Sequence, residues 1–166
     1  MEKAYNNFQL TGLVVLRMLV GWHFLYEGIV KLMNPNWSAK GYLMGSETLF
    51  GLFSTLGASS GAVGVIDFVN IWALIFVGLS LILGVYNKIG SITGICLLGM
   101  YYLAYPPMLG FEGTMPTEGS YVFVNKNLIE LFALWIILVF PTSRHIGLDR
   151  LFSKKREDQV ISMSPR

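Results

Sequence analysis

Four ionisable residues lie inside one long apolar stretch near the start of the chain. The stretch runs over residues 11–33 and contains Arg17, His23, Glu27 and Lys31. As a helix rising about 1.5 Å per residue it would be roughly 33 Å long, close to the thickness of the hydrocarbon core of a bilayer. A charged group at the centre of such a helix costs about 2.5–3.5 kcal/mol. Because carboxylates and imidazoles can exchange protons with a substrate, this stretch is the first candidate for chemistry.

The four residues share one face of the predicted helix. At about 100° per residue, taking Arg17 as 0°, the other three fall near 240°, 280° and 320°. One interpretation is that Glu27 and Lys31 neutralise each other and lock the helix packing. The other is that this face forms a functional site, the default hypothesis for ionisable residues inside a membrane. The opposite face carries apolar residues that we expect to face lipid: Val14, Met18, Leu25 and Val30.

The composition indicates a small membrane domain. The 166 residues are 54% hydrophobic and only 13% charged, and the mean hydropathy is +0.57, whereas charged residues make up about 25% of typical soluble domains. The single cysteine, Cys96, excludes an internal disulfide or a thiolate metal cluster. Basic residues gather only at the predicted membrane edges and the tail, so we expect no nucleic-acid partner. The first apolar stretch is too long and too charged for a cleaved signal peptide.

The apolar segments predict an all-α membrane protein, a bundle of four transmembrane helices. The second span ends at a tight turn formed by Asn87 and Lys88. The fourth is short for a full crossing unless it begins at Tyr121. The four spans are expected over residues 11–33, 64–86, 89–105 and 127–140.

The long connection over residues 36–63 is expected to cap this bundle. An apolar run from Thr48, after Ser46, predicts a short interfacial or re-entrant helix in this first outer loop. We place the four-helix membrane domain at residues 1–152 and a basic, disordered cytoplasmic tail at residues 153–166.

Lysine and arginine beside the spans predict the orientation. They gather at the N-terminus, at the turn near Lys88 and in the tail, and they are scarce in the two long loops. Both termini are therefore expected in the cytoplasm. Arg17 then falls in the inner half, where we expect a structural role, and His23 lies near the middle. Polar residues from every span fall in the outer half, where facing helices can form a ligand cavity: Glu27, Lys31, Asp67, Asn70, Tyr101, Tyr102, Tyr105, Asn127 and Glu130.

Ordinary structural roles compete with this site. Asn127 and Glu130 have the spacing of a helix N-cap and its capping-box partner. Asp67 is predicted in the first turn of its helix, where the helix dipole favours a carboxylate. The tyrosines are also typical of an aromatic belt at the lipid interface. His23 fits a core histidine as well as a proton carrier. We predict no metal site, and no bis-histidine haem, because His145 lies beyond the fourth span.

Three segments carry a family likeness: residues 17–43, the run GLSLILGVY of residues 78–86, and residues 124–151, which contain the sequence NKNLIE at 125–130. They resemble the DoxX/DoxD family of small four-helix bacterial membrane proteins, and the likeness covers roughly residues 12–152. The resemblance implies quinone-dependent oxidation, because DoxD is similar to the large subunit of a thiosulfate:quinone oxidoreductase that works with a second small subunit. It also implies the bacterial cytoplasmic (inner) membrane. The first segment carries the family's pattern at Arg17, Gly21, Gly28, Lys31 and Leu32.

The residues and the resemblance together favour a quinone-linked oxidoreductase subunit. The catalytic groups that move protons are expected to be Glu27, Glu130 and His23. Lys31, joined by Lys126, is expected to attract an anionic donor such as thiosulfate. The remaining candidates for substrate binding are Asp67, Asn70, Tyr101, Tyr102 and Asn127.

The sequence has no motif for haem, an iron–sulfur cluster or a flavin, so a quinone is the expected redox group unless a partner brings another. The expected partners are the lipid bilayer and a second small redox subunit, with a homo-oligomer left open. Two alternatives belong to other classes. One is a non-catalytic scaffold or assembly partner for a redox complex, and the other is a small solute transporter.

Overall fold

The chain folds into long helices joined by short helices, a tight turn and a small hairpin. The computed structural model describes residues 6–46, 51–106, 120–121 and 123–150. The expected helix start at Thr48 and the expected tail over residues 153–166 lie outside these ranges. The elements in chain order are α1 (Asn7–Met33), α2 (Lys40–Met44), α3 (Leu52–Ala58), α4 (Ser60–Leu83), α5 (Asn87–Ala104), β1 (Ser120–Tyr121), β2 (Val124–Asn125), α6 (Lys126–Val139) and the 3₁₀ helix η2 (Thr142–Arg144).

Helix α1 begins and ends at strong sequence signals. The side chain of Asn6 accepts a hydrogen bond from the backbone of the first turn, and the side chain of Gln9 accepts one from the Asn6 N–H at 3.2 Å. At the other end Pro35 follows the C-cap residue Asn34 and cannot continue the helix. The predicted first helix is therefore confirmed, at 27 residues.

Helices α1 and α4 pack closely because glycines remove the side chains between them. A Cβ added at Gly28 would lie 2.7 Å from Cγ1 of Ile75, and one at Gly78 would lie 2.5 Å from the backbone nitrogen of Leu25. Such distances leave no room for a methyl group in a close-packed interface. Leu25 therefore packs against α4, and the expectation that it faces lipid is wrong.

A tight turn reverses the chain between α4 and α5. Gly84 ends α4 with φ 64°, and Tyr86 follows with φ 51°. Glycine adopts this left-handed conformation without steric cost, so the turn forms at residues 84–86. The predicted turn residues Asn87 and Lys88 instead begin α5.

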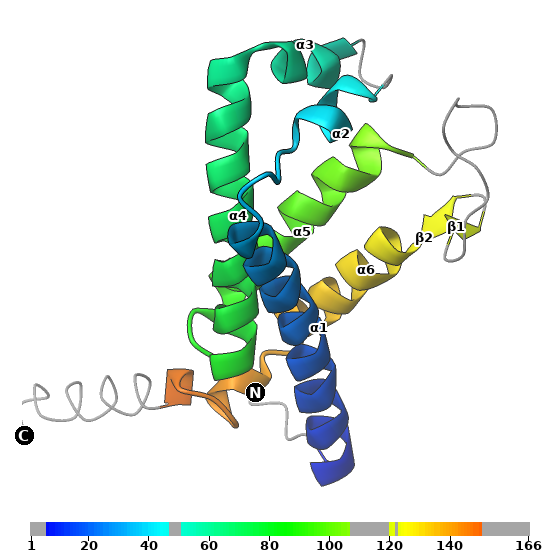
Figure 1. Cartoon of the computed structure of the whole chain (residues 1–166). Helices are drawn as coiled ribbons and strands as arrows, with labels where there is room; N and C mark the ends of the chain where they lie inside the picture. The colour runs from blue at the N-terminus through cyan, green and yellow to red at the C-terminus, as the bar shows by residue number, and fades with distance from the viewer. Residues whose placement is uncertain (1–5, 47–50, 107–119, 122, 151–166) are drawn as a thin grey trace, which may run out of the picture.

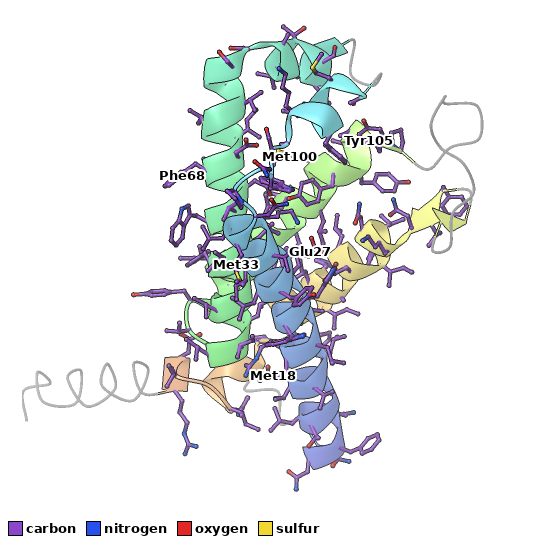
Figure 2. The ribbon with its side chains drawn as sticks, in the orientation of Figure 1. Met18, Glu27, Met33, Phe68, Met100 and Tyr105 are labelled. Carbon is purple, nitrogen blue, oxygen red and sulfur yellow. The ribbon has the colours of Figure 1, made fainter. Side chains whose placement is uncertain are left out.

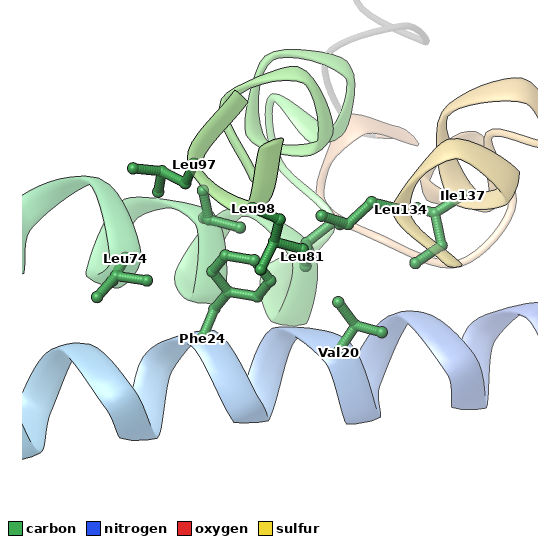
Figure 3. Close-up of a cluster of buried hydrophobic side chains, with 9 residues drawn as sticks. Val20, Phe24, Leu74, Leu81, Leu97, Leu98, Leu134 and Ile137 are labelled. Atoms are coloured by element: carbon green, nitrogen blue, oxygen red, sulfur yellow. The ribbon is translucent and has the colours of Figure 1, made fainter. Parts of the chain in front are cut away.

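The hydrophobic core lies where the four long helices approach one another (Figure 3). Each of its residues is at most 7% exposed, so the core is closed to solvent. Figure 1 shows α1 crossing the other long helices, with the start of α1, the α4–α5 turn and η2 at one end of the molecule. The core residues are Val20, Phe24, Leu74, Val77, Leu81, Leu97, Leu98, Leu134 and Ile137.

Arg17 joins α1 to the segment that follows α6 at this end. The residue is 2% exposed, and its guanidinium donates to Oγ1 of Thr142 at 3.1 Å and to the carbonyl oxygen of Ile146 at 2.7 Å. Because a planar guanidinium can donate in two directions at once, one side chain fastens two points of the C-terminal segment.

Helices α2 and α3, which we call the cap, lie at the opposite end of the molecule (Figure 1). The Ala39 N–H donates to Oδ1 of Asp67 at 2.7 Å, so the chain leading into the cap is tied to α4. The Ser46 hydroxyl donates to the carbonyl oxygen of Ala104 at 2.7 Å and ties the cap to α5. Helix α3 begins after Gly51, which has φ 78°. The connection therefore contains two short helices where the sequence predicts one.

Within the described part of the chain, two helices, α1 and α4, are long and apolar enough to cross a membrane, judged by length and composition. Helix α4 begins at residue 60, earlier than predicted, because the Ser59 side chain accepts a hydrogen bond from the Ala62 N–H and caps it. Helix α5 has 18 residues and α6 has 14. Because β1 and β2 form a hairpin directly before α6, the longer fourth helix starting at Tyr121 is wrong. A bundle of four spans stays a prediction.

Candidate functional site

A cavity of about 620 Å³ lies between the four long helices and the cap. Its volume is within the range of about 300–1,000 Å³ found for small-molecule sites. Most of its lining side chains are apolar. Figure 2 shows Glu27 on the side of α1 that faces α6. Among the residues that the structure describes, the acidic and basic side chains of the lining come from these two helices: His23, Glu27, Lys31, Lys126 and Glu130.

A hydrogen bond between His23 and Glu130 joins α1 to α6 at the cavity wall. His23 Nδ1 lies 2.7 Å from Oε1 of Glu130. The Glu130 side chain is only 12% exposed, whereas that of His23 is 43% exposed. A carboxylate that accepts the Nδ1–H proton orients the ring and leaves Nε2 able to exchange a proton with a bound molecule.

Glu27 extends this polar group along α1. Its Oε1 lies 4.0 Å from Nε2 of His23, and its Oε2 forms an ion pair with Lys31 one turn further on. The ammonium of Lys31 also lies 5.7 Å from the centre of the Trp37 ring, a cation–π arrangement. The two carboxylates, the imidazole and the ammonium thus form one connected row beside the cavity.

A second polar pair lies on the α4 and α5 side of the cavity. The Tyr101 hydroxyl donates to the side-chain oxygen of Asn70, and both residues line the cavity. The pair satisfies two polar groups in a wall that is otherwise apolar. It leaves the other hydrogen-bonding atoms of the Asn70 amide as a polar contact for a ligand.

Four of the residues predicted for the site or its cavity lie outside the cavity lining: Arg17, Asp67, Tyr102 and Tyr105. Asp67 accepts the Ala39 N–H and lies two turns after the start of α4, so the prediction that it lies in the first turn is wrong. Tyr102 donates to the carbonyl oxygen of Phe123 at 2.8 Å. Arg17 is at the opposite end of the molecule. Asp67 and Tyr102 therefore hold loops in place, where the sequence predicts substrate contacts.

The helix N-cap of α6 is Asn125 and not Asn127. The Asn125 side chain accepts a hydrogen bond from the Leu128 N–H at 3.0 Å, because strand β2 delivers an extended residue at that position. Asn127 and Glu130 instead line the cavity. The capping-box interpretation of these two residues is therefore wrong, and Glu130 is available to His23.

The cap and the segment that leads into it contribute aromatic residues that the sequence alone does not place in the site. Trp37, Tyr42 and Phe53 line the cavity. The Tyr42 hydroxyl donates to the carbonyl oxygen of Tyr101 at 3.1 Å, and the Tyr105 hydroxyl donates to that of Tyr42 at 2.8 Å. Partial burial, together with the neighbouring Tyr105 and Tyr101, raises the pKa of Tyr42 above its usual value. The sequence does carry a signal for their role, because aromatic residues are numerous in a connection that is otherwise rich in glycine and serine.

This arrangement can hold a mainly apolar molecule and exchange protons with one of its polar ends. The row of His23, Glu27 and Glu130 supplies two acid–base pairs within one cavity. Within the described ranges, no group of three or more histidine, cysteine, aspartate or glutamate residues could hold a metal ion.

Comparison with known proteins gives one match. A protein-family model described as DoxX matches residues 12–105, a range that covers most of α1 and all of the chain from there to the end of α5. A search of curated proteins and a search of solved structures each found no match.

Proposed function

This chain belongs to the DoxX family of membrane proteins, and from that premise we propose that it is a quinone-linked oxidoreductase subunit. The proposal rests above all on one observation. The His23–Glu130 hydrogen bond lies at one end of a cavity whose other walls are mainly apolar. A quinone headgroup has the matching form, a flat apolar ring with carbonyl oxygens that accept hydrogen bonds.

The residues of the cavity fit such a ring. His23 and Glu130 supply a donor next to a largely buried carboxylate, and Asn70 supplies an amide on the facing side. Phe24, Leu74 and other core side chains close the remaining walls and exclude water. A quinone bound there would accept two electrons and two protons, the electrons coming from two thiosulfate anions that become joined through a sulfur–sulfur bond.

The chain's own residues would handle the protons. His23 donates from Nε2, and Glu130 stabilises the ring while it is protonated. Glu27 lies 4.0 Å from the same nitrogen and replaces the proton that His23 gives up. Glu27 is 42% exposed at its side chain, which lets it take protons from water.

Basic side chains at the open side of the row would attract an anionic donor. Lys31 and Lys126 both line the cavity on the α1 and α6 side. A reduced sulfur anion such as thiosulfate fits this positive charge. A second small subunit that presents the donor, or a second copy of the chain, would complete the assembly.

We further propose that the protein lies in the bacterial cytoplasmic membrane, crosses it four times and has both termini on the cytoplasmic side. The α4–α5 turn and the segment after α6 lie at the same end of the molecule as the start of α1 (Figure 1). Lys88 is the second residue of α5, directly after this turn, which supports the orientation. Helix α6, with 14 residues, is about 21 Å long, so the bilayer must thin around it or the hairpin before it must lie in the headgroup region.

The test is reconstitution in liposomes that contain a quinone, with thiosulfate and other reduced sulfur anions offered as donors. We expect donor-dependent quinol formation, followed by absorbance. Glu130→Gln and Glu27→Gln should each slow it by about 10²–10⁴-fold, the usual share of a positioned acid–base group. Asp149→Asn is the matched control, because an amide oxygen can still accept the Tyr86 N–H far from the cavity.

Full activity in both carboxylate variants would remove the acid–base roles. Solute flux through the liposomes without any redox change would favour a transporter. A protein that neither binds a quinone nor moves a solute would be a scaffold for other redox proteins, and the proposal would be wrong.

A further inference from the structure

The cavity has an apolar mouth on the side away from His23 and Glu130. Three of its aliphatic lining residues are also exposed at the protein surface: Val65 at 63%, Val69 at 55% and Met100 at 49%. A side chain that both lines a cavity and reaches the surface marks an opening. Leu56 of the cap also lines the cavity and completes this apolar group.

The mouth forms because α4 and α5 separate as they approach the cap. Near their connecting turn the two helices touch, since a Cβ added at Gly90 would clash with Oγ of Ser80. Figure 1 shows α5 leaning away from α4 towards the cap. Val65 and Val69 are one helical turn apart on α4, and they border the space that the separation leaves.

Side-chain directions agree with this opening. In Figure 2 Phe68 projects from α4 away from the other helices, whereas Met100 lies between α4 and α5. Phe68 is 64% exposed but does not line the cavity. Exposure alone therefore does not place a residue of α4 at the mouth. Tyr42 of the cap also lines the cavity and is 41% exposed, so the opening extends from the α4–α5 side to the cap.

The two sides of the cavity therefore differ in chemistry. Glu27, at 42% side-chain exposure, and Lys126 border the α1–α6 side with charge. The α4–α5 side is bordered by Val65, Val69 and Met100 alone among the exposed lining residues of those helices. With α4 crossing a bilayer, an apolar opening on its flank faces lipid, where only a lipid-soluble molecule can approach.

We propose that the α4–α5 mouth receives the isoprenoid tail of a membrane quinone. This inference rests on the proposed function and specifies its substrate class as a tailed quinone that enters sideways from the bilayer. The ring lies towards His23 and Glu130, and the tail leaves between Val69 and Met100 into lipid. The water-soluble donor reaches the charged α1–α6 side by a separate route.

Photolabelling of the wild-type protein in lipid nanodiscs tests this path. The probe is a quinone with a diazirine on its isoprenoid tail, and the labelled residues are mapped by mass spectrometry. We expect labels on α4 around residues 65–69 and on α5 around Met100, and we expect an excess of the tail-free quinone to abolish them. Labels concentrated on α1 and α6 would overturn the inference.

Variants at the mouth give a second, independent test. Val69→Trp narrows the opening, so the Kd of the tailed quinone should rise at least tenfold while that of the tail-free quinone stays within twofold. Val15→Trp is the matched control, because Val15 is 51% exposed on α1 and does not line the cavity. Equal effects of Val69→Trp and Val15→Trp would overturn the inference.

The same measurements distinguish a wrong entry path from a wrong proposed function. If the tail-free quinone binds the wild-type protein and the tailed probe labels other helices, the path is wrong and the proposed function stands. If neither quinone binds, the proposed function is wrong, and the path is overturned with it.

Discussion

His23 on α1 and Glu130 on α6 form a hydrogen bond of 2.7 Å between Nδ1 and Oε1. The two residues are 107 positions apart in sequence, so the contact exists only because the first and last long helices lie side by side. It is a polar contact between two helices that otherwise meet through apolar side chains such as Val20 and Ile137. Loss of this hydrogen bond would therefore affect both the packing of α1 against α6 and the polar wall of the cavity.

A double-mutant cycle on this pair should reveal strong coupling. His23→Ala and Glu130→Ala should each lower the free energy of unfolding, and the double variant should lose less than the sum. Contacting residues usually couple by about 0.5–3 kcal/mol. The measurement is thermal or denaturant unfolding in one detergent. The control cycle pairs His23→Ala with Asp149→Ala, at the other end of the molecule, and should be additive. Additivity in both cycles would contradict the observed contact.

Lys31→Met should weaken the binding of the anionic donor and leave the binding of the quinone unchanged. Removing the ammonium takes positive charge from the cavity and leaves the Glu27 carboxylate without its ion-pair partner. The negative charge of Glu27 then repels an anionic donor. We expect the KM of an anionic donor to rise about tenfold, equivalent to about 1.4 kcal/mol, with an unchanged KM for the quinone. Lys88→Met, an exposed lysine at the start of α5, is the control. A rise in both KM values would mean that the cavity itself has collapsed.

Gly78→Ala should destabilise the contact between α1 and α4. Its new methyl group would lie 2.5 Å from the backbone nitrogen of Leu25, which cannot move without displacing α1. Overpacking of this kind costs about 1–3 kcal/mol in the free energy of unfolding. Gly64→Ala on the same helix meets nothing within 4 Å and should cost nothing. Equal stabilities of the two variants in denaturant titrations would show that α1 and α4 are further apart than described.

Tyr42 should make the fold sensitive to alkaline pH. Burial raises the pKa of its hydroxyl in the folded chain, whereas in the unfolded chain the pKa stays near 10. Above about pH 10 the unfolded chain therefore loses a proton that the folded chain keeps, and the free energy of unfolding falls as the pH rises. Melting temperatures measured from pH 8 to 11 should show this decline. Tyr42→Phe should reduce its slope, and an unchanged slope would exclude Tyr42 as its source.

Much of the fold could be predicted from local signals. The first helix ends where Pro35 forces it to, and the long apolar runs locate α4 and α5 to within a few residues. The family likeness of the segment around Arg17 is confirmed by the DoxX match, whereas the NKNLIE segment lies beyond the matched residues. The start of α4 is hard to predict because Ser59 caps a helix whose first turns contain two glycines, and such a sequence favours a loop in isolation.

The site was harder to predict because it depends on tertiary contacts. Helical spacing groups His23, Glu27 and Lys31 on one face, and the structure brings Glu130 to the same place. Spacing cannot show that Asp67 turns to the backbone of Ala39, or that the cap lays Tyr42 over the cavity. The cap also depends on the left-handed Gly51, which a single sequence does not mark as different from its neighbouring glycines. The catalytic and binding roles stay predictions.

The most direct test of the central claim is a density map of the protein purified with its native membrane lipids and an added quinone. The account predicts a flat ring between His23 and Asn70, with its polar edge towards Glu130 and its tail passing between α4 and α5. A cavity without ring density at saturating quinone, or a ring bound at another surface, would contradict it.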